Sequence, residues 1–149
     1  MSTQAADLVV RKSLTVAAPL ERAFEVFTER MGAWWPFASH SIHGEEVESL
    51  VFEGREGGSV HEVARGGETA PWATVLAWEP PTRVLLSWHV NPQNPATEVE
   101  VTFAPEGEGT RVVLEHRGFE RLGDRGEIGR GNYDEGWEYV LGRFADGIG

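Results

Sequence analysis

The last segment of the chain, Asn132–Gly149, constrains the fold more than any other part of the sequence. Its large apolar residues recur at intervals of three and four, so they share one face of a helix; they are Tyr133, Trp137, Val140, Leu141, Phe144 and Ile148. Much of the chain before it alternates apolar and polar residues, a pattern typical of strands. Because so bulky a face must be buried, the sequence predicts a long closing helix packed across a sheet.

The strand pattern begins near the N-terminus, where Leu8–Val16 alternates with a period of two, and returns over the central part of the chain. Six further strands are predicted there: Val47–Glu53, Ser59–Arg65, Trp72–Trp78, Val84–Val90, Glu98–Phe103 and Val112–Arg117. Glycine- or proline-rich turns separate several of them, among which are Gly54–Gly58, Pro80-Pro81 and Gly107–Gly109. Successive strands joined by short turns indicate an antiparallel meander.

Two short helices are expected after the first strand. Pro19 suits the first turn of a helix that runs to about Glu29 and ends by Gly32, and residues 33–37 form an aromatic turn that breaks before Pro36. Gly118–Gly131 is expected to be an irregular loop, and Asn132 to cap the closing helix. The fold class is therefore α+β, with seven antiparallel strands, a long C-terminal helix and two short helices after strand 1.

Composition narrows the possible functions. The chain has 149 residues, consistent with a single domain over 1–149, and a formal net charge of −11, which disfavours binding to nucleic acid or to an anionic membrane surface. It contains no cysteine, which excludes disulfides, thiolate metal sites and cysteine nucleophiles. The polar start lacks the pattern of a secretory signal, and no apolar run approaches the ~20 residues that span a bilayer, so a cytoplasmic protein is expected.

The order and spacing of several segments resemble a known family. These segments are Ser13–Phe27, Trp34-Trp35-Pro36, Val75–Trp88 (VLAWEPPTRVLLSW), Gly109–Phe119 (GTRVVLEHRGF) and Gly136-Trp137. Together they resemble the Bet v 1-like, START-related (SRPBCC) helix-grip superfamily, and within it the bacterial homologues of the activator of Hsp90 ATPase. The resemblance implies a sheet that grips the C-terminal helix around a hydrophobic cavity. It also implies a choice among carriers, cyclases, sequestering proteins and chaperone co-factors, because a fold this widely reused does not fix a function.

The candidate ligand-binding residues are those expected on the concave face of the sheet and on the apolar face of the closing helix. They are Trp72, Trp78, Trp88, Phe103, Leu114, His116, Tyr133, Trp137, Leu141 and Phe144. Two interpretations stay open, since the same residues can line a pocket for a flat apolar ligand or fill a core. His116 can likewise bind a ligand or be a buried histidine. Gly136 and Gly142, inside the helix, suggest close packing against the sheet or room beside Trp137.

Other chemistry has weaker support. His40 and His43, beside Glu45, Glu46 and Glu48, carry metal-ligand side chains, but no further ligand is apparent, so no metal site and no cofactor is expected. Common nucleophile, phosphate and dinucleotide motifs are absent from the sequence, so no catalytic residue is assigned.

Three functions are consistent with these residues. Binding of a small hydrophobic molecule, including an aromatic one, ranks first. A cyclase- or hydrolase-type enzyme is the alternative, with Tyr133 or His116 as acid or base and Trp88 and Trp137 as walls. A chaperone co-factor role, implied by the resemblance, ranks below it, and the protein is expected as a monomer or homodimer.

Overall fold

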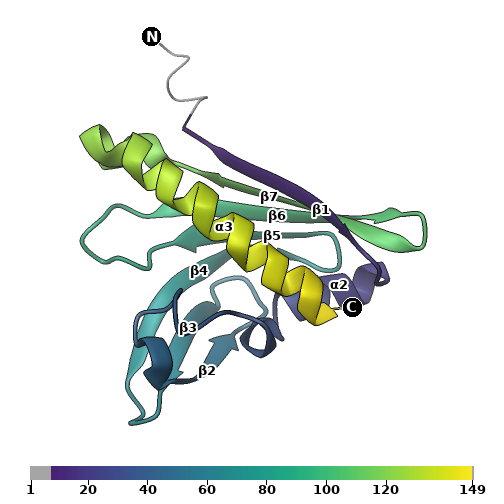
Figure 1. Ribbon diagram of the computed structural model, residues 1–149, viewed down its shortest axis with the longest axis horizontal. Helices are drawn as coiled ribbons and strands as arrows, with labels where there is room; N and C mark the ends of the chain where they lie inside the picture. Colours follow the sequence, from purple (N-terminus) through teal and green to yellow (C-terminus); the bar gives the residue numbers. More distant parts are fainter. Residues whose placement is uncertain (1–7, 149) are drawn as a thin grey trace.

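The computed structural model describes residues 8–148, in which seven strands form one antiparallel sheet in the order β1-β7-β6-β5-β4-β3-β2. The strands are β1 (Val10–Val16), β2 (Val47–Phe52), β3 (Ser59–Ala64), β4 (Thr69–Glu79), β5 (Arg83–Trp88), β6 (Thr97–Glu106) and β7 (Gly109–Arg117). The predicted meander is confirmed, and β1 lies beside β7, so the first and last strands are neighbours. The long helix α3 (Gly126–Ile148) lies across one face of the sheet (Figure 1).

The sheet is bent by irregularities in β4. In the pairing with β3, Pro71 and Ala73 have partners on consecutive residues of β3, so Trp72 is an extra, unpaired residue between them. In the pairing with β5, Leu76 is extra in the same way between Val75 and Ala77. Extra residues of this kind bend a strand and increase its twist. The predicted alternation through Trp72–Trp78 therefore fails in the middle of β4: Val75 is buried and Leu76 is 45% exposed.

The helices after β1 differ slightly from expectation. Helix α2 (Leu20–Phe27) ends two residues before the predicted Glu29, and a 3-10 turn, η1 (Met31–Ala33), follows it. The Thr28 hydroxyl donates a hydrogen bond to the Phe24 carbonyl oxygen at 2.7 Å, where the helix stops. A second 3-10 turn, η2 (Gly44–Glu46), leads into β2.

The closing helix begins earlier than predicted. Residues 126–131 are helical, and a 3-10 segment, η3 (Phe119–Arg125), precedes them, so the expected loop over Gly118–Gly131 is wrong and Asn132 lies inside the helix instead of capping it. Glycine lets these two segments pack closely: a Cβ at Gly126 would lie 2.6 Å from the Phe119 carbonyl oxygen. The glycines that suggested a loop instead permit contact between η3 and α3.

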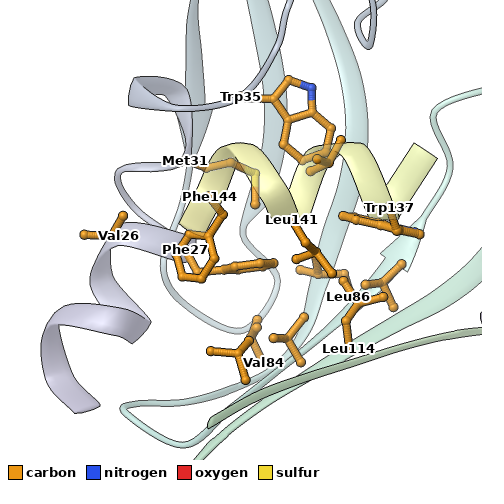
Figure 2. Close-up of a cluster of buried hydrophobic side chains, with 14 of the residues drawn as sticks. Val26, Phe27, Met31, Trp35, Val84, Leu86, Leu114, Trp137, Leu141 and Phe144 are labelled. Carbon is orange, nitrogen blue, oxygen red and sulfur yellow. The ribbon is translucent and has the colours of Figure 1, made fainter. Parts of the chain in front are cut away.

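The core lies between α3, α2 and the concave face of the sheet. Figure 2 shows Leu141 and Phe144 pointing from α3 into this layer, with Phe27 of α2 beside them. Phe144 packs edge-on against Phe27, with ring centroids 5.2 Å apart, and Phe27 meets Phe103 of β6 at 5.8 Å. At this end of the helix, the inward side chains fill the space between α3, α2 and the sheet.

Candidate functional site

A pocket of about 210 Å³ lies beside the middle of α3, away from the filled end of the core. It is lined by Trp35, Ser39, His40, Ser41, Trp72, Trp88, Val90, Tyr133, Gly136, Trp137 and Val140. Four of the six tryptophans of the chain are in this lining. The pocket is therefore an aromatic site with a short polar rim at residues 39–41.

The four tryptophans of the lining, here called the tryptophan tetrad (Trp35, Trp72, Trp88 and Trp137), touch one another in a closed circuit. Successive ring centroids are 4.9 Å apart for Trp35 and Trp72, 6.2 Å for Trp72 and Trp88, 5.5 Å for Trp88 and Trp137, and 5.9 Å for Trp137 and Trp35. All four are more than nine-tenths buried. Tilted and edge-on contacts at these distances are favourable aromatic geometry, so the tetrad forms one continuous aromatic wall.

Each indole N–H of the tetrad has its own acceptor. Trp35 donates to the His40 carbonyl oxygen at 2.7 Å, and Trp72 donates to Oε1 of Glu62 at 2.7 Å. The other two indoles donate to side chains: Trp88 to the Tyr133 hydroxyl at 3.3 Å, and Trp137 to Nδ1 of His116 at 3.0 Å. Because the polar edges are bound to the protein, the tetrad offers a ligand its ring faces.

Tyr133 supplies a hydrogen-bond donor to the pocket. Its hydroxyl oxygen accepts from Trp88, and a phenol that accepts in this way can still donate its own proton. Burial raises the pKa of Tyr133 above its usual value, and the hydrogen bond from Trp88 only partly offsets this. The phenol is therefore neutral at physiological pH, and it is a donor on an otherwise aromatic wall.

His116 lies behind this wall and not in the pocket lining. It is fully buried, and burial lowers its pKa to about 3, so the ring is neutral. Since Nδ1 accepts from Trp137, Nε2 carries the proton and donates to Oγ1 of Thr97 at 2.7 Å. Both ring nitrogens are hydrogen-bonded within the protein, so the contacts of His116 hold Trp137 in place.

The remaining predicted site residues divide between the pocket and the core. Trp72, Trp88, Tyr133 and Trp137 line the pocket. Phe103, Leu114, Leu141 and Phe144 belong to the packed core, and Trp78 lies at the far end of the sheet, where it contacts Phe24 at 5.0 Å and Phe52 at 6.0 Å. Four of the ten predicted residues thus line the pocket, and the periodicity of the sequence did not indicate where along α3 the packing opens.

The polar rim of the pocket was not predicted from the sequence. Ser39 and His40 share a hydrogen bond of 2.6 Å between Oγ and Nδ1, and the His40 ring stacks on Tyr139 of α3 at 5.2 Å. Gly136 lies beneath this contact: a Cβ built there would meet only Cδ2 of His40, at 4.0 Å. Close packing against the sheet does not explain Gly136 or Gly142, which both have open space at the Cβ position. At Gly136 that space is part of the pocket.

The histidines singled out for metal binding have other contacts. His43 donates through Nδ1 to Oε2 of Glu62 at 2.7 Å, and His40 is held at the rim as described above. Within residues 8–148, no three side chains of the metal-ligand types gather as a metal site requires. No helix in the same range has the length and apolar character needed to cross a bilayer.

Comparison with known proteins agrees with the fold. Residues 17–148 match the family described as activator of Hsp90 ATPase homolog 1-like protein. The chain belongs to this family. The family was predicted from the sequence, and the match confirms it. A search of curated proteins gave no match.

Several solved structures are similar over nearly the whole chain, and two of them are the following. The anthrahydroquino-gamma-pyrone synthase Txn09, solved in complex with SUM, is 33% identical, with a TM-score of 0.62 and coverage of 93% of this chain and 95% of that one. CalC from Micromonospora echinospora, a self-sacrificing resistance protein, is 29% identical, with a TM-score of 0.67 and coverage of 94% and 93%. A synthase and a resistance protein thus share this fold.

Proposed function

We propose that this protein binds a small, planar, largely apolar molecule in the pocket formed by the tryptophan tetrad. The tetrad carries the proposal: four buried indoles with their N–H groups already bonded leave flat apolar faces toward the pocket. The Tyr133 hydroxyl adds one donor, so a ligand with a carbonyl or phenolic oxygen on its edge fits best. At about 210 Å³ the pocket lies below the ~300 Å³ typical of drug-sized sites, which favours a small ligand.

The two similar structures support this ligand class. The name of Txn09 denotes a fused aromatic ring system, and CalC is described as a resistance protein. A carrier or sequestering protein for a polycyclic aromatic compound would need an aromatic pocket and one or two orienting hydrogen bonds, which are the features present here. The acidic chain would also favour neutral or cationic ligands over anionic ones.

The proposal is tested by titration with 1,8-dihydroxyanthraquinone, followed by tryptophan fluorescence and calorimetry. We expect saturable one-to-one binding with quenching of the tetrad. Tyr133→Phe removes the donor and should weaken binding by roughly 2- to 10-fold, the value of one neutral hydrogen bond. Trp88→Phe should weaken binding too, whereas Trp78→Phe, which alters a tryptophan outside the pocket, should not.

The proposal fails if the wild-type protein binds no planar aromatic probe up to the limit of probe solubility. It also fails if Trp78→Phe and Trp88→Phe reduce affinity equally, because binding would then not depend on the pocket.

A second candidate function, proton-transfer catalysis, is favoured by the rim. Ser39 and His40 form a hydrogen-bonded pair in the pocket lining, and a 33%-identical relative is a synthase. A histidine backed by a hydroxyl can act as a general base. The test is exchange of the acidic C–H of 1-tetralone in deuterated water: catalysis lost in His40→Gln but kept in His61→Gln would support an enzyme, and no acceleration by the wild-type protein would count against it.

A further inference from the structure

Glu62 is a carboxylate at a position where the strand pattern calls for an apolar residue. In β3 the inward positions are Val60, Glu62 and Ala64, and Glu62 is fully buried. Removing an ionised carboxylate from water is costly unless hydrogen bonds compensate it. A glutamate here therefore needs a specific set of partners.

Four donors surround this carboxylate. Oε1 accepts from the backbone N–H of Ile42 at 2.8 Å and from Nε1 of Trp72 at 2.7 Å. Oε2 accepts from the backbone N–H of His43 at 2.6 Å and from its Nδ1 at 2.7 Å. Burial raises the pKa of Glu62, but these hydrogen bonds outweigh it and hold the pKa below its usual value, so the group stays ionised.

The four donors come from the pocket wall and from the two residues that follow the rim. Trp72 is a member of the tetrad, whereas Ile42 and His43 directly follow the rim residues His40 and Ser41. The rim segment is itself tightly folded, because the Ser41 hydroxyl donates to the Phe37 carbonyl at 2.5 Å and accepts from the Gly44 N–H at 2.8 Å. Because residues 42–43 directly follow the rim, fixing their position also fixes the position of the rim. Glu62 therefore links the rim to Trp72 in the wall of the pocket.

We propose that Glu62 is a positioning residue that ties residues 42–43, and through them the rim at residues 39–41, to Trp72 and thereby sets how tightly and how long the pocket holds its ligand. This inference rests on the proposed ligand-binding function. Glu62 does not line the pocket and is not assigned contact with the ligand. Its part is to hold the irregular rim in one place above the sheet, because its oxygens accept the hydrogen bonds that residues 42–43 donate.

Glu62→Gln is the sharpest test because it keeps shape and volume. The amide offers one acceptor oxygen, and its NH₂ group faces donors that the carboxylate satisfied. With 1,8-dihydroxyanthraquinone in stopped flow, we expect dissociation about ten-fold faster than for the wild-type protein, the equivalent of one lost charge-assisted hydrogen bond. His43→Ala removes only one of the four hydrogen bonds, so it should increase the dissociation rate by only about three-fold. This variant replaces Glu62→Gln in the test if Glu62→Gln does not fold.

A matched control separates positioning from general stability. Glu100→Gln removes a carboxylate paired with Arg83 and Arg117 on the outer face of the sheet, away from the pocket. It should lower the denaturation midpoint but leave probe dissociation unchanged. If Glu62→Gln lowers the midpoint and leaves dissociation unchanged as well, Glu62 is only structural and the inference is wrong.

A second readout needs no ligand. Amide hydrogen exchange at Ile42 and His43 should be faster in Glu62→Gln than in the wild-type protein, and unchanged in Glu100→Gln. Unchanged exchange in Glu62→Gln would overturn the inference directly. If the wild-type protein binds no planar probe but exchange at the rim accelerates, the proposed function fails while the tie between Glu62 and the rim stands.

Discussion

Burial of His116 predicts a specific loss of stability in mild acid. The folded protein holds this ring neutral, with a pKa of about 3 against the ordinary 6.5. In the unfolded chain the same ring takes up a proton as the pH falls through 6.5. Between these two values the unfolded state binds more protons than the folded state, so stability present above pH 6.5 is lost as the pH falls toward 3. The cause is removal of the ring from water.

The magnitude follows from the two pKa values. Lowering the pH from 7 to 5 reduces the free energy of unfolding by about 2 kcal/mol through this one group, because over this range the ring takes up a proton only in the unfolded chain. The full difference, reached near pH 3, is about 5 kcal/mol. A domain with a typical stability of about 5–15 kcal/mol would lose a substantial part of it at pH 5.

Urea denaturation at pH 7, 6 and 5 measures this effect, with His116→Gln as the comparison. Glutamine can accept from Trp137 and donate to Thr97 but does not titrate. The wild-type protein should lose about 2 kcal/mol more than the variant between pH 7 and pH 5, since the acidic groups common to both proteins cancel. Parallel pH profiles for the two proteins would refute the reasoning, because they would mean that His116 accepts a proton in the folded state.

Two further predictions concern the packing that positions the site. Phe144→Ala should destabilise the protein by about 3–5 kcal/mol, measured by chemical denaturation. Phe144 is fully buried against Phe27 and Trp34, so its removal leaves a cavity. A loss below about 1 kcal/mol would contradict the filled core at this end of α3. Gly109→Ala should be strongly destabilising, since the added Cβ would collide with the Val16 carbonyl oxygen where β1 meets β7. A wild-type melting temperature would show that the strand ends are not in contact.

Much of the fold could be predicted because its strands are regular and its turns are short. Val99, Val101 and Phe103 alternate with polar residues along β6, and such a pattern leaves one choice of buried face. The pattern failed in β4, where the extra residues Trp72 and Leu76 change which side chains point inward. A single sequence gives no clear signal for such irregularities, because they arise from the way neighbouring strands meet.

The candidate site was only partly predictable for a related reason. The aromatic residues of the wall lie on regular elements, so Trp72, Trp88, Tyr133 and Trp137 could be grouped from their periodicity. The rim residue His40 lies on an irregular segment, and its place is fixed by contacts with Glu62-bound neighbours and with α3, which are distant in sequence. His116 was correctly placed on the inward face, but only its contacts show that it supports Trp137 and lies outside the pocket lining.

The most direct test of ligand binding fills the pocket from inside. Gly136→Leu places a side chain in the open space below His40, and Gly142→Leu places the same side chain at another open helix position, outside the pocket. Both replace a helical glycine, so each should raise stability by up to about 1 kcal/mol. Titrated with 1,8-dihydroxyanthraquinone, Gly142→Leu should bind like the wild-type protein and Gly136→Leu should not bind. Equal affinity in all three proteins would contradict a binding site between the tryptophan tetrad and α3.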